Sequence, residues 1–276
     1  MPAKQVKGAA GVMGWPVKHS LSPKLHGYWI DQYGFDTRYD LLPVEPENLE
    51  NALHSLLVNG YTGCNLTLPH KTEALKHMSV ISDTAKAIGA VNTVVVQSDG
   101  SLFGDNTDAY GFIQSLNTQC SGWQKTVTSA LIIGAGGAAK AVLFGLKDAG
   151  IDNITVANRT IEKAKSLCDT AISISDIRDI LPETDLIINT TSLGMAGQPP
   201  LDIDISALPK HAIVADIVYV PRKTDLLKQA EELGLKTAEG IDMLLHQAVP
   251  AFEHWFDIRP DVTDDLKDMI LNEVAS

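Results

Sequence analysis

A glycine-rich turn between an apolar run and an amphipathic run limits the folds open to this chain more than any other stretch. Residues 129–150 read SALIIGAGGAAKAVLFGLKDAG. The first five favour a β-strand, and the spacing of Val142 and Leu146 favours a helix that ends before Gly150. Glycines in the turn let the backbone approach a pyrophosphate, which the positive end of the helix attracts. The stretch therefore predicts the strand, phosphate loop and helix of a Rossmann-type fold.

The residues after this unit indicate which dinucleotide would bind. A second strand over 154–157 leads into Asn158, Arg159 and Thr160, where an NAD-binding fold would carry an acid for the ribose 2′-hydroxyl. A guanidinium there suits a 2′-phosphate, and Lys163 adds positive charge one turn later. We therefore expect NADP as the cofactor. The alternative is a flavodoxin-like unit that binds no nucleotide and carries a surface arginine.

Up to residue 108 the pattern alternates between strand and helix. We expect a first helix with Ser22 as its cap and Pro23 in its first turn. A second helix begins after Pro46 and stops at Asn59, and a third covers 83–88. The expected strands are 8–13, 37–42, 63–68, 91–96 and 101–103. Because the last two form a hairpin, this part should be an α/β domain with a mixed sheet.

The remainder of the chain predicts a second domain. Further strands over 185–189 and 212–216, with a helix over 226–233, indicate a doubly wound parallel sheet. After Gly240 the pattern is helical to the end, and we expect these helices to return to the first domain. The predicted division is a substrate-binding and catalytic domain, 1–108 with 241–276, and an NADP-binding Rossmann domain, 109–240.

Charge and composition exclude several classes of partner. A net charge of −12 argues against nucleic acid and against anionic membrane surfaces. No apolar run approaches the roughly 18 residues of a membrane span, and the stretch over 8–14 is too short and glycine-rich for a signal peptide. Cys64, Cys120 and Cys168 are too few for a disulfide framework or a zinc cluster. We expect a cytoplasmic monomer or homodimer that binds small molecules and no metal.

Polar residues gather at the predicted strand ends of the first domain more than packing requires. Hydroxyl groups suit a carboxylate and amides suit hydroxyls, so the implied ligand is a small polyhydroxy acid. A lysine and an aspartate remain for proton transfer. The residues concerned are Ser20, Ser22, Asn65, Thr67, Lys71, Asn92 and Asp108.

Each of these residues also has a simpler explanation. Ser22 and Asp108 could cap helices, and Asn92 could stabilise a turn. Lys71 could be a solvated lysine, and Gln247 could reach solvent from its helix. Only their joint occurrence favours a site.

The order and spacing of the motifs resemble the shikimate dehydrogenase family over nearly the whole chain. The matching stretches are 14–23 (GWPVKHSLSP), 63–71 (GCNLTLPHK), 89–93 (GAVNT), 104–108 (GDNTD), 134–138 (GAGGA), 158–160 (NRT), 216–219 (DIVY) and 240–247 (GIDMLLHQ). The resemblance implies reversible, NADP-dependent reduction of 3-dehydroshikimate to shikimate. Two departures are Gly27, where many members have a bulkier polar residue, and Lys163, where an arginine is frequent.

The resemblance also implies a role for individual residues. Lys71 would be the acid/base, with Asp108 beside it. The implied substrate contacts are Ser20, Ser22, Thr67, Asn92, Asp108, Tyr219 and Gln247. The implied cofactor contacts are Asp83, Gly134, Ala135, Gly136, Gly137, Ala138, Asn158, Arg159, Thr160, Lys163, Ile217 and Gly240.

Two other functions stay open at this point. A quinate/shikimate dehydrogenase would accept an extra hydroxyl group and use NAD or NADP, although Arg159 and Thr160 favour NADP. A protein that senses shikimate or a nucleotide without turnover would need neither Lys71 nor Asp108, and the chain has both.

Overall fold

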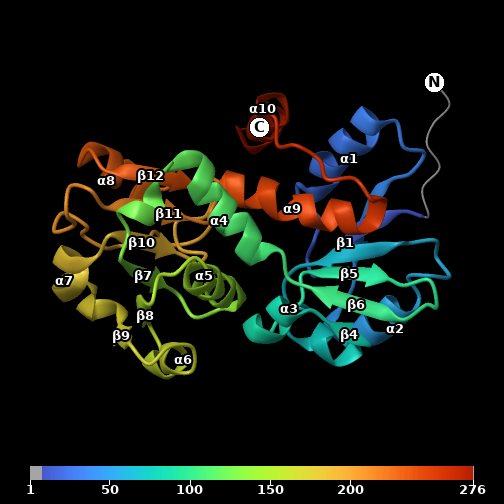
Figure 1. Ribbon diagram of the computed structural model, residues 1–276, viewed down its shortest axis with the longest axis horizontal. Helices are drawn as coiled ribbons and strands as arrows, with labels where there is room; N and C mark the ends of the chain where they lie inside the picture. Colours follow the sequence, from blue (N-terminus) through green and yellow to red (C-terminus); the bar gives the residue numbers. More distant parts are fainter. Residues whose placement is uncertain (1–7, 276) are drawn as a thin grey trace. The chain divides into compact units, whose positions relative to one another are not determined.

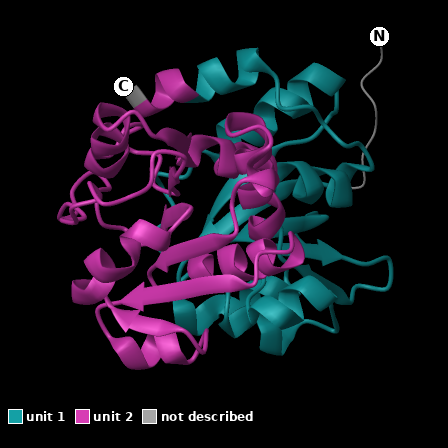
Figure 2. Cartoon of the chain, turned by 60° about the vertical axis from the view of Figure 1, so that its left-hand side comes forward, with its two compact units in different colours: residues 1–107, 247–270 teal, residues 108–246, 271–276 magenta. Residues whose placement is uncertain are grey.

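The structure is a computed structural model that describes residues 8–275 and contains two six-stranded sheets (Figure 1). The chain forms two compact units (Figure 2). Unit 1 comprises Met1–Thr107 and Gln247–Ile270, and unit 2 comprises Asp108–His246 and Leu271–Ser276. The long helix α9, Gly240–Phe256, contributes residues to both units.

Unit 1 is built on a mixed sheet of strand order β2-β1-β3-β5-β6-β4. The strands are β1 (Ala10–Gly14), β2 (Tyr39–Pro43), β3 (Gly63–Leu66), β4 (Val80–Ile81), β5 (Thr93–Val96) and β6 (Leu102–Asp105). Strand β1 is parallel to β2 and β3, whereas β5 is antiparallel to β3 and β6. The carboxyl ends of β1, β3 and β6 and the start of β5 therefore lie at the same edge of the sheet.

Helices cover this sheet and bury an apolar core. They are α1 (Ser22–Tyr33), α2 (Leu49–His54), α3 (Asp83–Ile88) and the short 3₁₀ segments η1 (Pro46–Asn48) and η2 (Glu73–His77). One core cluster joins Met13, Leu53, Cys64 and Val94. Burial raises the pKa of the Cys64 thiol to about 12, which excludes a thiolate at neutral pH. Cys120 is also buried, whereas Cys168 is only partly buried.

Three local predictions in unit 1 are wrong. The helix expected to reach Asn59 ends at His54, because the Ser55 hydroxyl donates to the Ala52 carbonyl and the following turns tighten. The strand expected to reach Leu68 ends at Leu66, and Leu68 is 75% exposed before a cis Leu68–Pro69 bond. Proline has no N–H for the ladder, so the strand cannot continue.

The third error concerns the start of α1. Leu21 occupies the N-cap position and no side chain caps the helix. Ser22 is the first helical residue, and its N–H donates to the Ser20 hydroxyl at 3.3 Å. The explanation of Ser22 as a cap is therefore excluded, and Pro23 lies in the first turn as predicted.

Unit 2 is built on a parallel sheet of strand order β12-β11-β10-β7-β8-β9. The chain leaves β7 in one direction for β8 and β9 and later returns to β10, so the topological switch point lies between β7 and β10. Strands β9 and β12 were not expected. The strands are β7 (Ser129–Ile133), β8 (Asn153–Asn158), β9 (Ala171–Ser173), β10 (Leu186–Asn189), β11 (Ile213–Asp216) and β12 (Lys236–Glu239).

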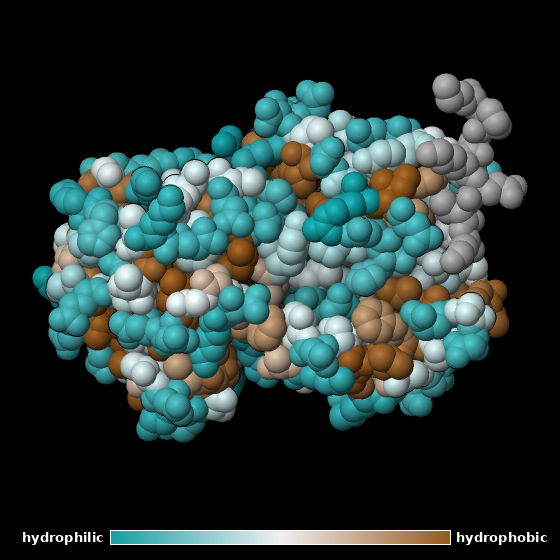
Figure 3. Space-filling view, viewed as in Figure 1, coloured by the Kyte–Doolittle hydropathy of each residue, from teal (hydrophilic) through white to brown (hydrophobic). Residues whose placement is uncertain are grey.

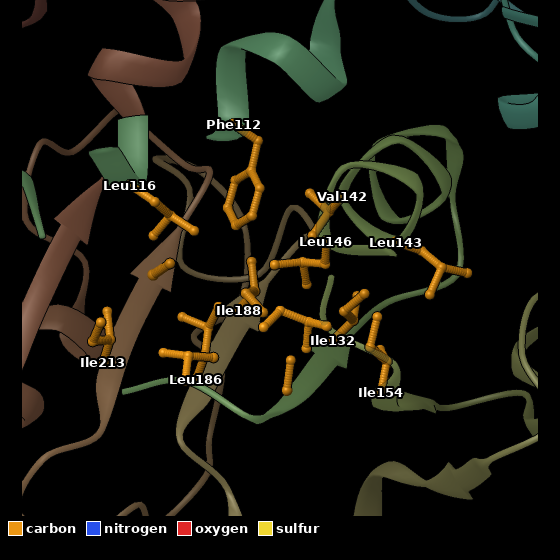
Figure 4. Packing of buried hydrophobic residues seen from close by; sticks show 14 of the residues in the cluster. Phe112, Leu116, Ile132, Val142, Leu143, Leu146, Ile154, Leu186, Ile188 and Ile213 are labelled. Atoms are coloured by element: carbon orange, nitrogen blue, oxygen red, sulfur yellow. The ribbon is translucent and has the colours of Figure 1, made fainter. Parts of the chain in front are cut away.

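Helices of unit 2 pack their apolar faces on this sheet. Figure 4 shows Phe112 of α4 and Leu146 of α5 pointing toward Ile188 of the sheet. Ala139, at the third glycine position of the phosphate loop, is 1% exposed, so its methyl group permits close packing of the helix against the strand. The helices are α4 (Asp108–Gln119), α5 (Gly137–Asp148), α6 (Ile161–Lys165), α7 (Ile177–Ile180) and α8 (Asp225–Glu232), with 3₁₀ turns at Trp123–Lys125, Ile174–Asp176 and Leu181–Glu183. The last helix, α10 (Asp264–Ala275), contributes residues to both units.

The mixed sheet and the doubly wound parallel sheet confirm the predicted α/β fold class. Among residues 8–275, no helix is both long and apolar enough to span a bilayer. On the face shown in Figure 3, hydrophilic residues predominate and hydrophobic residues form small groups.

Gly27 offers a test of helix packing in unit 1. It lies inside α1, and a Cβ atom built there would meet nothing within 4 Å. Because glycine in a helix interior loses more backbone entropy than alanine, Gly27→Ala should raise the free energy of unfolding by about 0.5–1 kcal/mol. Urea denaturation of both proteins measures this difference, and a lower midpoint in the variant would show that the position is sterically closed.

Asp185 offers a test of stability in unit 2. Burial alone would raise its pKa, but hydrogen bonds from Thr128, His211 and Ser129 lower it to about 2. A depressed carboxyl pKa contributes stability that is complete above the unfolded pKa of 3.8 and is lost as pH falls through about 2. Asp185→Asn should therefore lower the free energy of unfolding at pH 7 by about 1–3 kcal/mol, and the difference from wild type should shrink in acid denaturation series below pH 4.

Candidate active site

The edge of the unit 1 sheet defined above carries most of the predicted substrate residues. Ser20 and Ser22 follow β1, and Thr67 and Lys71 follow β3. The two connections are joined, because the Thr67 N–H donates to Met13 at 2.9 Å and the Trp15 N–H donates to Leu68 at 3.1 Å. A Cβ atom on Gly14 would lie 2.3 Å from the Thr67 methyl group, so only glycine permits this approach.

Lys71 is linked to the start of β5 through the backbone. Its carbonyl accepts a 2.8 Å hydrogen bond from the Val91 N–H. The next residue, Asn92, is 2% exposed, and its side-chain oxygen accepts from the Thr107 N–H at 2.8 Å. Its amide donates to the Thr107 hydroxyl at 3.0 Å. A continuous set of contacts therefore joins the Lys71 segment to Thr107, the residue that directly precedes Asp108 in the chain.

Asp108 and Lys71 differ in their surroundings. Asp108 is 7% exposed and is the first residue of α4, so it lies in the first helical turn. Lys71 is half-buried in the turn before η2 and is not an exposed first-turn lysine. Asn92 stabilises the turn at Thr107, which agrees with the simpler explanation of this residue. Gln247 is half-buried on α9.

Tyr39 and Asn65 form a buried pair beneath the serines. The Tyr39 hydroxyl donates to the Asn65 side-chain oxygen at 2.7 Å, and the Ser22 hydroxyl lies beside the same phenol. The Asn65 amide donates to the Asn92 carbonyl and to the Thr93 hydroxyl. Tyr39 is absent from the predicted site, since nothing in a tyrosine inside a strand indicates its distant partner.

His26 lies in the same aromatic layer. Its ring stacks on Tyr39 at a centroid distance of 4.2 Å, and neither ring nitrogen has a hydrogen-bond partner among the described residues. Burial lowers the pKa of His26 to about 3, so the ring is neutral at pH 7.

The glycine-rich loop of unit 2 has the shape of an anion cradle. Gly134 has φ +113°, and a Cβ atom there would lie 2.6 Å from the Thr190 hydroxyl, so the loop needs glycine at this position. By contrast, Cβ atoms on Gly136 and Gly137 would meet nothing within 4 Å. Those two positions leave open space at the first turn of α5, where backbone N–H groups attract phosphate oxygens. The loop therefore fits a pyrophosphate.

Basic residues flank the end of the neighbouring strand β8. Arg159 and Lys163 are exposed, and neither forms an ion pair within the part of the chain that the structure describes. The Asn158 amide donates to the Thr160 carbonyl at 2.9 Å and shapes this turn. Unpaired basic side chains beside the cradle fit the additional phosphate that distinguishes NADP from NAD.

The other predicted cofactor residues, together with Tyr219 of the predicted substrate contacts, fall into two places. Gly240, at the carboxyl end of β12, contacts Ile217 directly, because a Cβ atom there would lie 2.5 Å from the Ile217 carbonyl. Tyr219 follows in the same connection and is partly buried, which raises the pKa of its phenol. Asp83 instead belongs to unit 1, where its exposed carboxylate pairs with Lys86 at 3.3 Å.

Asn189 and Asp216, two polar residues of unit 2, have no role in the sequence-based prediction. Asn189 ends β10 beside the topological switch point and donates to Asp216 at 3.0 Å. A polar residue at the end of an otherwise apolar strand next to the phosphate-loop strand was the available signal. Among the described residues, no group of three or more His, Cys, Asp or Glu side chains could hold a metal ion.

Comparison with known proteins identifies the family that this chain resembles. Three family models match the chain: the shikimate dehydrogenase substrate binding domain over residues 12–94, shikimate / quinate 5-dehydrogenase over 118–225, and the shikimate 5′-dehydrogenase C-terminal domain over 240–266. The NADP(+) shikimate dehydrogenase of Paramagnetospirillum magneticum is 47% identical over 269 residues, covering 95% of this chain and 98% of that protein.

Solved structures show the same fold. Shikimate 5-dehydrogenase from Thermus thermophilus, in complex with NADP(H) and shikimate, has a TM-score of 0.84 at 33% identity, over 96% of this chain and 99% of that one. Quinate dehydrogenase from Corynebacterium glutamicum, in complex with NAD, has a TM-score of 0.89 at 29% identity, over 98% and 100%.

Proposed function

The chain belongs to the shikimate dehydrogenase family of oxidoreductases, and we propose that it catalyses the reversible, NADP-dependent reduction of 3-dehydroshikimate to shikimate. The observation that carries this proposal is the convergence of Ser20, Ser22, Thr67, Lys71 and Asn92 on one edge of the unit 1 sheet. Hydroxyl, amide and ammonium groups together suit a small acid that carries several hydroxyl groups.

The two units divide the binding work. Unit 1 binds the substrate, with Ser20 and Ser22 on its carboxylate. Thr67, Asn92, Asp108, Tyr219 and Gln247 bind the remaining oxygens, and of these residues Asp108 and Tyr219 belong to unit 2. We assign residues 1–108 with 241–276 to the substrate domain and 109–240 to the cofactor domain.

NADP fits the carboxyl edge of the unit 2 sheet. The open backbone at Gly136 and Gly137 receives the pyrophosphate, and Arg159 with Lys163 binds the 2′-phosphate. When bound, the reduced cofactor supplies the hydride for the reaction. The remaining cofactor contacts of the proposal are Asp83, Gly134, Ala135, Ala138, Asn158, Thr160, Ile217 and Gly240.

Lys71 moves the proton. In reduction its ammonium group donates a proton to the carbonyl oxygen that becomes the alcohol, and in oxidation its amine accepts that proton back. Asp108 accepts a hydrogen bond from the same alcohol and orients it. The hydrogen bond from the Val91 N–H to the Lys71 carbonyl holds the backbone of Lys71 in place. The side chain that carries the ammonium group therefore extends from a fixed position.

A spectrophotometric assay of reduced nicotinamide tests the proposal. Shikimate and quinate are each supplied with NADP and with NAD, and we expect turnover of shikimate with NADP to be the fastest. Faster turnover of quinate with NAD would identify a quinate dehydrogenase, an activity carried by the similar fold from Corynebacterium glutamicum. Binding of shikimate without turnover in any combination would identify a sensor protein instead.

The same reasoning extends to the setting of the enzyme. A net charge of −12 disfavours nucleic acid and anionic membranes as partners. We propose a cytoplasmic enzyme that works on dissolved small molecules as a monomer or homodimer. Light scattering during gel filtration measures the oligomeric state.

A further inference from the structure

Asp216 is a buried carboxylate for which the proposed reaction has no use. It ends β11 and is 2% exposed. One carboxylate oxygen accepts from the Asn189 amide at 3.0 Å and from the Val218 N–H at 2.9 Å, and the other accepts from the Thr224 hydroxyl at 2.7 Å. Val218 and Thr224 lie near opposite ends of residues 217–224, here called the β11–α8 loop. A single side chain therefore holds both ends of this loop.

A second carboxylate holds the carboxyl-terminal part of the β11–α8 loop. Glu239, the last residue of β12, accepts from the Arg222 guanidinium at 2.7 Å and lies 3.4 Å from the Lys223 ammonium. The adjacent Gly240 allows the loop backbone to lie against β12 with no side chain between them. The loop that carries Ile217 and Tyr219 is therefore held at its start and at its end.

Asn189 links Asp216 to a second connection, the one that follows β10. Its side-chain oxygen accepts from the Thr191 N–H at 3.0 Å, and its amide donates to the Leu193 carbonyl at 3.0 Å as well as to Asp216. The connection after β10 and the β11–α8 loop thus share one buried polar network beside the switch point, where doubly wound sheets bind their ligands.

The ionised form of Asp216 is disfavoured by folding. Burial raises its pKa to about 6 although three hydrogen bonds favour the ionised form. Between the unfolded pKa of 3.8 and about 6 the folded chain binds more protons than the unfolded chain, so this group makes the protein less stable as pH rises through that window. Asp185, at the amino end of the same sheet, has the opposite shift. A buried charge that opposes folding is a candidate for a functional task.

We propose that Asp216 is a positioning residue that holds the β11–α8 loop so that Ile217 and Tyr219 meet the cofactor and the substrate. This inference rests on the proposed function, which assigns those contacts. Asp216 acts through the loop and touches neither ligand. A displacement of about 1 Å at such a loop can lower turnover by about 10²-fold, so the position of the loop strongly affects the rate.

Asp216→Asn tests the proposal with little change in volume. The amide oxygen can still accept from Asn189 and Val218, but the amide nitrogen cannot accept from Thr224. We expect kcat/KM for shikimate to fall about 10- to 100-fold, with a higher KM for both shikimate and NADP. The melting temperature at pH 7 should be equal to that of wild type or higher, because a buried charge has been removed.

Two controls separate positioning from general damage. Asp185→Asn alters a carboxylate of the same sheet at its other end, and it should lower the melting temperature while kcat/KM below the transition stays at the wild-type value. Thr224→Ser keeps the hydroxyl group that donates to Asp216 and should retain wild-type kinetics, whereas Thr224→Val should lower kcat/KM in the direction of Asp216→Asn.

Wild-type kinetics in Asp216→Asn would overturn the inference, as would a loss of activity that only follows a fall in melting temperature. A failure of wild-type protein to oxidise shikimate with NADP would overturn the proposed function, and the two failures are distinguishable because the second appears without any substitution.

Discussion

Replacing Lys71 by alanine is expected to lower kcat about 10²- to 10⁴-fold, with a much smaller change in KM. Reduction of a carbonyl needs a proton at the oxygen in the same step in which hydride reaches the carbon. Removal of the amine leaves water as the donor, and water has no fixed position there. Steady-state rates in both directions, fitted separately for kcat and KM, measure the effect.

Lys76 provides the matched control. It lies five residues further along the same segment, in η2, and its exposed ammonium pairs with Glu73 at 2.8 Å. Lys76→Ala removes the same functional group from the same connection and should leave kcat unchanged. Equal rates in Lys71→Ala and wild type would remove Lys71 from the chemistry, and equal losses in both variants would point to disruption of the segment.

The phosphate loop was predictable because its signals are local. The strand, turn and helix of residues 129–150 lie next to each other in the chain, and each has its own sequence pattern. The turn needs glycine at position 134 because φ is positive there. Ala139 must be small because the helix period places it on the buried face of the helix. The hairpin of β5 and β6 was predictable for the same reason.

The errors have more than one source. Pro69 cannot donate to the ladder, so it was a local signal for the end of β3, but the apolar residues that precede it favoured a longer strand. Strands β9 and β12 are short and partly exposed at the edges of the sheet, so they lack the apolar run that marks a buried strand.

The supporting residues of the site were missed for a related reason. Asp216 stands in a motif whose later member, Tyr219, received a role, but its own partners lie 27 and 8 residues away at Asn189 and Thr224. Residue type and spacing can indicate groups that meet a ligand, since the ligand's chemistry is known. They cannot indicate groups that meet only other groups of the protein, because those pairings are set by the tertiary fold.

Replacing Arg159 by alanine is expected to raise KM for NADP about 10- to 100-fold and to leave KM for NAD nearly unchanged. Charge-assisted hydrogen bonds to a phosphate contribute about 1.5–3 kcal/mol, and only NADP has the phosphate that would receive them. The guanidinium is exposed and has no ion-pair partner in residues 8–275, so its loss breaks no internal contact that would confuse the measurement.

Two further variants make this test specific. Arg178→Ala removes an exposed guanidinium from α7 of the same unit and should change neither cofactor's KM. Lys163→Ala should raise KM for NADP by less than Arg159→Ala, because a single ammonium makes no bidentate contact. If Arg159→Ala raised KM for NAD and for NADP equally, Arg159 would have to contact a part that both dinucleotides share. The 2′-phosphate would then need another partner.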